Sequence, residues 1–312
     1  MSESTSGQGG PAETKEGQGS LTLTALGAGS AFSRKWGTTC SMLRLPNSER
    51  WLIDCGRQAP DQVWRAGMTW WDIAGQIVTH VHGDHAYGIE DFALMRYYGG
   101  PGLGKPIIAG GSKAQLLAHS AVMQELREFL SPSLRYLTEP VGVTCEGRLE
   151  EYFVMVEARA NEKPDKTAWN HSETFDFGDI GLTARETRHV TGKPSTSLEI
   201  ALDSSGRSIA WWGGDCLVDP EYLERLEPRT TLFFHDCTFS TPHPGHVHAS
   251  FEELRQLPAK IRNKMVLMHH DDDLEQHASK AVAAGFRVLL PGQTYDLRRG
   301  VLVRGPASVD AL

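Results

Sequence analysis

The chain has 312 residues, of which 40% are hydrophobic and 22% are charged, and its formal net charge is −8. These values fit a globular protein with a large buried core, and the acidic balance argues against broad electrostatic capture of nucleic acid or of an anionic membrane. The five cysteines are odd in number and lack Cys-x-x-Cys spacing, so neither a disulfide framework nor a thiolate zinc site is indicated. A reducing, cytoplasmic setting is therefore expected.

The first 19 residues, MSESTSGQGGPAETKEGQG, are rich in Gly, Ser, Glu and Gln and contain no apolar run. This composition predicts a disordered tail at residues 1–19 and not a signal peptide. No segment approaches the run of about 18 apolar residues that marks a membrane-spanning helix, so no membrane span is expected.

Strand-like runs follow the tail in SLTLTALG, CSMLRL and RWLIDCG. A helix is predicted at 60–67, followed by the strand GQIVTH and by a second helix in AYGIEDFALMRYY. The segment THVHGDH, residues 79–85, spans the turn between that strand and that helix. In layered α/β proteins, loops at the carboxyl ends of strands are places where functional side chains converge.

This turn is crowded with His80, His82, Asp84 and His85, although imidazoles so close together repel one another when charged. Alternate positions at a strand end place His80 and His82 on one side, and the turn lets Asp84 and His85 face a second point a few ångströms away. Neutral imidazole and carboxylate suit zinc, and two ions about 3.5 to 4 Å apart can hold a bridging hydroxide. We therefore predict a two-metal site. The alternative is a helix-capping Asp84 flanked by incidental surface histidines.

Further candidate ligands stand at the ends of later strands. His189 ends the alternating run LTARETRHV, Asp215 follows RSIAWWGG, and His269 and His270 follow NKMVLM. Each has an ordinary alternative: a turn residue, a helix N-cap before VDPEYLERL, and a solvated histidine pair, respectively. Their serial placement at strand ends favours metal ligation.

The HxHxDH signature at residues 80–85 makes the chain, over about residues 20–305, resemble the metallo-β-lactamase superfamily. The resemblance implies an α/β fold, the αββα sandwich with two mixed sheets, and a metal site at one sheet edge. It also implies two Zn²⁺ ions, with Mn²⁺ as a substitute. The implied ligands are His80, His82 and His189 on one ion, Asp84, His85 and His269 on the other, and Asp215 bridging both.

Two finer assignments come from the same resemblance. His269 is preferred over His270 as the final ligand, because the family's last ligand follows an apolar strand and precedes a bulky residue. Asp54 in LIDCG matches the family's early aspartate, which supports the metal-binding loop from outside the ligand set. The alternative for Asp54 is an ordinary turn aspartate.

A second histidine cluster lies in FFHDCTFSTPHPGHVHASFEELRQLP, residues 233–258. Its elements HDCT (235–238) and HAS (248–250) resemble the paired HEAT and HST elements of the RNase Z branch, which processes tRNA 3′ ends. By that resemblance His248 contacts the substrate phosphate or protonates the leaving oxygen, and Asp236 holds its ring in the productive tautomer. The alternative is that Ser250 caps the helix FEELRQL and that the histidines are loop residues.

The sequence departs from RNase Z because it has no glycine-rich basic arm suited to a tRNA. The end of the second cluster is more similar to the anti-Pycsar branch of small phosphodiesterases, which hydrolyse cyclic nucleotides. In place of the arm, residues 99–178 are expected to form an insertion that serves as a lid or a dimer surface, with a helix at 112–130. Aromatic residues in or beside it are candidates for stacking on a base, although core packing is their commoner role: Tyr97, Tyr98, Phe153 and Trp169.

The residues and the resemblance together predict a cytoplasmic metal-dependent hydrolase of small phosphodiesters, above all cyclic nucleotides, with Asp84, Asp236 and His248 as its catalytic set. One folded domain is expected over residues 20–305, with a C-terminal tail at 306–312. A homodimer is expected, and stable nucleic-acid binding is not. The alternatives are an RNase Z-like tRNA 3′ endonuclease and a metal-dependent lactone or thioester hydrolase, which would not need Asp236 and His248.

Overall fold

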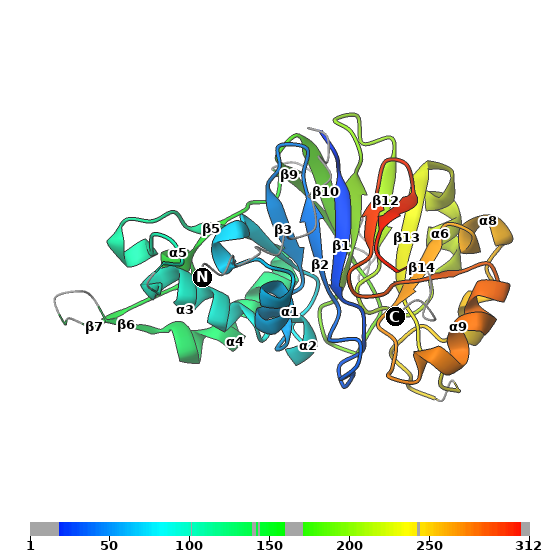
Figure 1. The fold of residues 1–312 in the computed structure, drawn as a ribbon, viewed down its shortest axis with the longest axis horizontal. Coiled ribbons are helices and arrows are strands. Elements are labelled where there is room, and N and C mark those ends of the chain that lie inside the picture. Colours follow the sequence, from blue (N-terminus) through cyan, green and yellow to red (C-terminus); the bar gives the residue numbers. More distant parts are fainter. Residues whose placement is uncertain are drawn as a thin grey trace, which may run out of the picture.

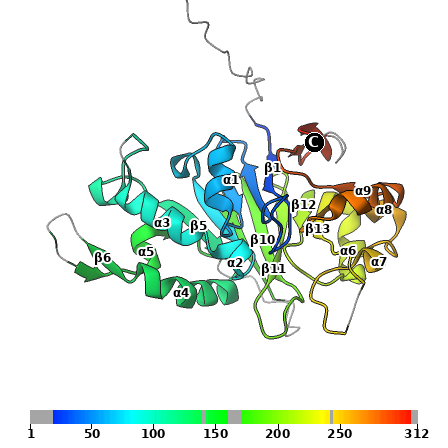
Figure 2. The same cartoon turned by 60° about the horizontal axis from the view of Figure 1, so that its bottom comes forward.

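The computed structural model describes residues 19–100, 102–138, 142, 144–159, 171–241 and 244–306. Two β-sheets pack face to face, and helices cover the outer face of each sheet (Figure 1), as the turned view shows from below (Figure 2). This is the αββα sandwich that the sequence predicted. The predicted tails lie outside the described residues except for their innermost positions, Gly19 and Pro306, and so does Trp169.

The first sheet has eight strands in the order β17-β16-β1-β2-β3-β4-β5-β8. The four strands from β3 to β8 pair in parallel, whereas the strands on the other side of β3 pair antiparallel. Their bounds are β1 (Thr22–Gly27), β2 (Cys40–Arg44), β3 (Arg50–Ile53), β4 (Gly75–Val78), β5 (Ala114–Ala118), β8 (Phe153–Met155), β16 (Thr294–Asp296) and β17 (Val301–Arg304).

The second sheet has seven strands in the order β15-β14-β13-β12-β11-β10-β9. Strands β12 to β15 pair in parallel and β9 to β12 pair antiparallel. Their bounds are β9 (Ser172–Phe177), β10 (Ile180–Glu186), β11 (Thr196–Ala201), β12 (Ile209–Trp212), β13 (Thr230–Asp236), β14 (Met265–Met268) and β15 (Arg287–Val288). A separate two-stranded sheet, β6 (Tyr136–Thr138) and β7 (Thr144–Glu146), projects at the far left of Figure 1.

Helices flank the two sheets on opposite sides of the molecule (Figure 2). The first sheet is accompanied by α1 (Ala59–Arg65), α2 (Gly83–Ala86), α3 (Ile89–Tyr98), α4 (Ser120–Leu134) and α5 (Leu149–Tyr152). The second is accompanied by α6 (Pro220–Leu226), α7 (Phe251–Leu254), α8 (Ala259–Arg262) and α9 (Leu274–Ala283). Short 3₁₀ turns are η1 (Trp70–Asp72), η2 (Ile107–Ala109) and η3 (Glu227–Arg229).

Alternation along the strands builds the apolar layers of this sandwich. In β12 and β13, Trp212 and Phe234 lie in the core between the sheets, whereas their neighbours Trp211 and Phe233 lie in the core under α6, α7 and α8. Successive side chains of a strand point to opposite faces, so a strand buried on both faces reads as a continuous apolar run. A third core joins the first sheet to α1, α3 and α4.

The helix predicted at 112–130 is wrong in its first part. Residues Ala114–Ala118 form β5, which pairs in parallel with β4 and β8, and α4 begins only at Ser120. A short apolar run such as AQLLA fits a buried strand as well as a helix, and periodicity cannot separate the two. Strands β5, β8 and β9, all within residues 99–178, thereby belong to the two main sheets.

Within the described ranges, no helix combines the length and the apolar character that crossing a bilayer requires. The cysteine side chains that the structure describes are buried and free: Cys40, Cys55, Cys216 and Cys237.

Candidate metal centre

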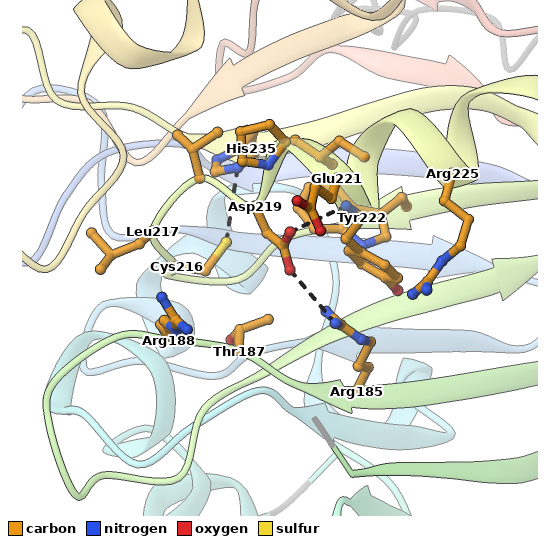
Figure 3. Close-up of a pocket in the computed structure, with 14 residues that line it drawn as sticks. Arg185, Thr187, Arg188, Cys216, Leu217, Asp219, Glu221, Tyr222, Arg225 and His235 are labelled. Atoms are coloured by element: carbon orange, nitrogen blue, oxygen red, sulfur yellow. Dashed lines mark hydrogen bonds and ion pairs between the residues drawn. The ribbon is translucent and has the colours of Figure 1, made fainter. Parts of the chain in front are cut away.

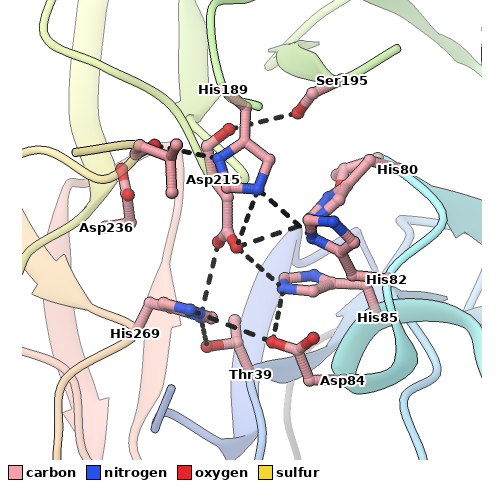
Figure 4. Close-up of polar contacts among 12 residues, drawn as sticks. Thr39, His80, His82, Asp84, His85, His189, Ser195, Asp215, Asp236 and His269 are labelled. Carbon is pink, nitrogen blue, oxygen red and sulfur yellow. Dashed lines mark hydrogen bonds and ion pairs between the residues drawn. The ribbon is translucent and has the colours of Figure 1, made fainter. Parts of the chain in front are cut away.

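The seven predicted metal ligands lie together at the edge of the sandwich where strands of both sheets end (Figure 4). The turn between β4 and α2 supplies four of them: His80, His82, Asp84 and His85. The second sheet supplies the other three, which follow β10, β12 and β14, respectively: His189, Asp215 and His269. Their side chains form two groups in which the candidate ligand atoms lie within 4.8 Å of one another.

The first group consists of His80, His82, His189 and Asp215. His82 Nδ1 lies 3.0 Å from His80 Nε2 and 3.2 Å from His189 Nε2. Asp215 Oδ2 lies 3.7 Å from His80 Nε2 and 4.0 Å from His189 Nε2. Ligand atoms around a tetrahedral zinc ion are about 3.3 Å apart when the bonds measure about 2.0 to 2.1 Å. The group therefore has the spacing of a four-coordinate cation site.

The second group consists of Asp84, His85, Asp215 and His269. His85 Nε2 lies 3.2 Å from Asp84 Oδ2 and 3.3 Å from Asp215 Oδ2. His269 Nε2 lies 3.9 Å from Asp84 Oδ2, and its Nδ1 lies 3.4 Å from Asp215 Oδ1. Asp215 belongs to both groups, which is the place predicted for a bridging carboxylate.

Hydrogen bonds on the outer side of the histidine rings direct lone pairs into the centre. His85 Nδ1 lies 2.8 Å from Asp54 Oδ2, and His189 Nδ1 lies 2.9 Å from the carbonyl oxygen of Val247. Because carboxylate and carbonyl oxygens only accept hydrogen bonds, both Nδ1 atoms carry the proton. The Nε2 atoms of neutral rings then face inward as acceptors, which is the state that metal ligation requires.

Two buried atoms of the centre have no hydrogen-bond partner among the described residues, His85 Nε2 and Asp215 Oδ1. Burial lowers the pKa of His85, but the charges of Asp215, Asp54 and Asp84 raise that pKa well above its ordinary value. Burial raises the pKa of Asp215, whereas His269 and His85 hold it well below its ordinary range. The centre therefore favours positive charge where these atoms meet. A divalent cation fits, since it would satisfy the unpaired atoms and balance the buried carboxylates.

Backbone strain marks two residues of the centre. Asp54 has φ 62° and His269 has φ 58°, in the left-handed region that non-glycine residues seldom adopt. Asp54 is held there by bonds from the backbone N and the hydroxyl of Thr79 and by its contact with His85. Strain of this kind persists where surrounding contacts over-determine the conformation. Asp54 thus lies where the predicted supporting residue should be.

His270 takes no part in either ligand group. Its Nε2 lies 2.8 Å from the carbonyl oxygen of Leu289, and its ring packs edge-on against Trp36 with the ring centroids 5.9 Å apart. The structure therefore brings His269, and not His270, to the other ligands.

His248 lies beside the centre, with its ring centroid 4.9 Å from that of His269 and 5.1 Å from that of His189. Its Nδ1 is 3.1 Å from Asp236 Oδ2 and 3.9 Å from Asp215 Oδ2. Burial lowers the pKa of His248, but the hydrogen bond to Asp236 and the charges of Asp215 and Asp236 raise it to about 9. The predicted pair is thus formed. Because Asp215, Asp236 and His248 also have ligand spacing, the geometry suits either proton donation or metal binding.

The alternative reading of this segment, helix capping by Ser250, is also present. Ser250 Oγ accepts from Glu253 N, and the Glu253 carboxylate accepts from Ser250 N, which is a capping box at the start of α7. His246 Nε2 lies 3.2 Å from Glu253 Oε1, and His243 is outside the described residues. Capping fixes the chain two residues after His248 and so helps to place that ring.

A cavity of about 550 Å³ lies on the outer face of the second sheet (Figure 3) and contains none of the predicted ligands. His235 lines it, and because neighbouring residues of β13 point to opposite faces, Asp236 faces the centre instead. Arg185 in this cavity lies 3.6 Å from Asp219 and 3.6 Å over the ring of Tyr222. Its charge is therefore engaged within the fold.

The predicted base-stacking residues that the structure describes have structural roles. Tyr97 and Phe153 are buried in the core between the first sheet and its helices. Tyr98 is more exposed, and its hydroxyl accepts a hydrogen bond from Thr138 N. For Tyr97 and Phe153 the core-packing alternative is correct.

Two threonines that orient ligands were not predicted. Thr79 Oγ1 donates to Asp54, so it accepts from His80 Nδ1 at 3.1 Å. Thr39 Oγ1 donates to the carbonyl oxygen of Gly29, in the loop after β1, and lies 3.2 Å from His269 Nδ1. Thr79 directly precedes the first histidine of the motif, which is a usable signal. Thr39 is 230 positions away from its partner, and nothing in its local sequence points to the centre.

Comparisons with known proteins agree with this geometry. The family model described as "Anti-Pycsar protein Apyc1" matches residues 21–295. The Apyc1 protein of Bacillus phage vB_BveM-Goe7 is 32% identical over 266 residues, which cover 83% of this chain and 92% of the relative. Among solved structures, the metallo-β-lactamase fold protein YhfI from Bacillus subtilis superposes with a TM-score of 0.62 at 14% identity, covering 88% of this chain and 99% of that one. Human tRNase Z, short form, gives 0.60 at 18% identity, with coverages of 88% and 99%.

The fold and the two ligand groups define a metallo-β-lactamase-fold protein with a site suited to divalent metal, and the predicted fold is confirmed. The chain belongs to the anti-Pycsar protein Apyc1 family.

His269 and His270 can be separated by paired substitutions. His269→Gly removes a ligand while accepting the positive φ of this position. It should lower metal affinity by at least the roughly 10- to 100-fold seen when supporting partners of metal ligands are lost. His270→Ala should mainly lower the unfolding temperature, because it empties a buried site. Metal affinity by competition with a chelator and thermal unfolding would be measured for both. A larger loss of affinity in His270→Ala would reverse the assignment.

Proposed function

We propose that the chain is a two-metal phosphodiesterase that hydrolyses small phosphodiesters, with cyclic nucleotides as the leading substrate class. One observation carries the proposal: two ligand groups share Asp215, and a histidine held by a buried carboxylate, His248 with Asp236, adjoins both of them. Hydrolysis of a lactone or thioester at such a centre would need the metal ligands but not His248 and Asp236. Phosphodiester hydrolysis needs the metal ligands and also a proton donor for the leaving oxygen, which this pair can supply.

His80, His82 and His189 would hold one ion, Asp84, His85 and His269 the other, and Asp215 both. When bound, two divalent ions lower the pKa of a water molecule to make it a nucleophile and balance the negative charge that builds on the phosphoryl oxygens. The protein side chains set up this chemistry in advance. Their outward hydrogen bonds fix the rings, and burial keeps competing water away from the carboxylates.

His248 is proposed as the general acid. Nδ1 is engaged by Asp236, so Nε2, on the far side of the ring, is the atom left to donate a proton to the substrate. The side chain of His248 is 31% exposed, whereas that of Asp236 is fully buried. A buried carboxylate that fixes the tautomer and stabilises the protonated ring is the arrangement that proton donation to a leaving oxygen requires. Asp236 acts through His248 and is a positioning residue.

The anti-Pycsar relatives support the small-substrate form of the proposal, because the resemblance to that branch implies cyclic-nucleotide hydrolysis. The net charge of −8 also disfavours a large polyanionic substrate. The tRNA 3′ endonuclease remains the second candidate, on the strength of the His248 and Asp236 pair that it would share. The likeness to human tRNase Z supports the fold and adds nothing to the choice of substrate.

Assays of the metal-loaded protein against cyclic mononucleotides, bis-nitrophenyl phosphate, a precursor tRNA and a lactone test the proposal directly. We expect turnover of the first two, with the tRNA and the lactone uncleaved. Cleavage of the lactone alone would overturn phosphodiester hydrolysis, and cleavage of the tRNA in preference to the cyclic nucleotides would favour the endonuclease.

Metal content tests the two-ion arrangement. The native chain should hold close to two zinc or manganese ions at saturation, measured by elemental analysis after removal of free metal. Asp215→Ala should lose more metal than any single histidine variant, because one carboxylate serves both groups. A native chain that saturates at one ion, or an Asp215→Ala chain that keeps two, would contradict the arrangement.

Leaving-group dependence tests the role of His248. His248→Ala should lower turnover of a cyclic nucleotide by about 100- to 10,000-fold while metal content stays native. The loss should shrink for bis-nitrophenyl phosphate, since nitrophenolate departs without a proton. Asp236→Asn should lose less activity than His248→Ala, because it only misorients the ring.

The other outcomes assign His248 differently. Equal losses on both substrates with full metal content would make His248 a phosphate-binding residue. Loss of metal from His248→Ala would make it a ligand, as its spacing to Asp215 and Asp236 allows.

A further inference from the structure

The carboxylate of Asp236 has a second histidine partner, His235, which the proposed mechanism does not use. His235 Nδ1 lies 2.9 Å from Asp236 Oδ1, whereas the other carboxylate oxygen, Oδ2, lies 3.1 Å from His248 Nδ1. The two histidines therefore hold one carboxylate, each through a different oxygen. His248 is on the side of the metal centre, and His235 is on the side of the cavity in the outer face of the second sheet (Figure 3).

The neighbours of the His235 ring assign its proton. Nδ1 also lies 2.9 Å from the backbone carbonyl oxygen of Asp236. Because carbonyl and carboxylate oxygens only accept hydrogen bonds, Nδ1 carries the proton. This one N–H faces both the backbone and the side chain of Asp236, so it ties the direction of the carboxylate to the end of β13.

The ring of His235 is itself held in place. It packs against Trp211 with the ring centroids 5.3 Å apart, and its Nε2 lies 3.9 Å from the sulfur of Cys216 (Figure 3). The side chain of His235 is 1% exposed, so it has little freedom to turn away from the carboxylate. A rigid donor on one oxygen limits the positions that the other oxygen can take.

Burial makes these contacts necessary. The side chain of Asp236 is fully buried, and a buried carboxylate costs free energy unless its oxygens accept hydrogen bonds. Burial raises the pKa of Asp236, but the hydrogen bonds from His235 and then from His248 lower it below its ordinary value. Asp236 thereby stays ionised, which is the state that accepts a hydrogen bond from His248 Nδ1.

We infer that His235 is a positioning residue for proton donation, because it fixes the Asp236 carboxylate that in turn holds His248 with Nε2 ready to protonate the leaving oxygen. The inference rests on the proposed phosphodiesterase function and adds a third residue to the His248 and Asp236 pair. Since His235 acts only through that pair, its loss should slow only those reactions whose leaving group needs a proton.

Turnover of two substrates with different leaving groups tests the inference. In the metal-loaded His235→Leu variant, kcat for 3′,5′-cyclic AMP should fall by about 10- to 100-fold, the range for losing a residue that supports a functional side chain. Turnover of bis-nitrophenyl phosphate should stay close to native, because nitrophenolate departs without a proton. His235→Asn should recover most of the cyclic AMP activity, since its amide N–H can take the place of Nδ1–H.

Trp211→Phe is the matched control for damage to the packing around His235. The Trp211 Nε1 atom has no hydrogen-bond partner among the described residues, so this change removes packing and no hydrogen bond to Asp236. It should lower the unfolding temperature and keep the native ratio of turnover on the two substrates. A ratio that shifts equally in Trp211→Phe and His235→Leu would overturn the inference.

Three results with the His235 variants would also overturn it. They are equal losses on both substrates in His235→Leu, a native ratio in that variant, and a His235→Asn chain as impaired as His235→Leu. Metal content would be measured on the same samples, because Cys216, His235 and Asp236 also have ligand spacing. Loss of metal from His235→Leu would make His235 a ligand and end its assignment as a positioning residue.

Failure of the activity itself gives a different result. A native chain that cleaves no phosphodiester would overturn the proposed function, and the hold of His235 on His248 can then be read from nitrogen NMR of labelled histidine side chains. His235→Leu should move the Nδ1 resonance of His248 and leave that of His277, on α9, in place. An unmoved His248 resonance would overturn the inference whether or not the chain is active.

Discussion

The carboxylate of Asp215 is the group on which the rest of the centre depends. It is buried and belongs to both ligand groups, so each of the other six ligands shares a group with this one residue. Gly213 and Gly214 precede it, and Gly214 has φ 61° with Thr196 O only 2.9 Å from where a Cβ would stand. The tight glycine turn after β12 therefore positions the Asp215 carboxylate opposite the turn between β4 and α2.

The buried carboxylate of Asp215 is surrounded by imidazoles, and the described side chains satisfy only part of its hydrogen-bonding capacity. The outer hydrogen bonds of His85 and His189 use the Nδ1 protons and leave the Nε2 lone pairs facing Asp215. Among the residues that the structure describes, His85 Nε2 and Asp215 Oδ1 then have no hydrogen-bond partner. Buried polar atoms without partners cost free energy, and a bound cation would remove that cost. The strained backbone conformations of Asp54 and His269 are another cost of building the centre, and the contacts of the centre hold these residues in place.

Much of the fold and of the site could be predicted because the information is local. HxHxDH lies within six residues, and His189, Asp215 and His269 each follow a recognisable strand, so serial order along the chain suggested convergence at one edge. Strand β5 and the contact of Thr39 with His269 could not be predicted. The first was missed because a short apolar run fits a buried strand as well as a helix, and the second joins residues that are 230 positions apart.

The substrate is decided by parts of the molecule that the shared fold leaves free to vary. Human tRNase Z has the same sandwich fold at 18% identity, and a shared fold alone does not imply a shared function. What bears on the substrate in this chain is its net charge of −8, because a tRNA needs an extended basic surface. The proposed general acid also lies next to the shared carboxylate, with His248 Nδ1 3.9 Å from Asp215 Oδ2. A substitution at this contact can therefore be interpreted only when metal content and turnover are measured on the same preparation.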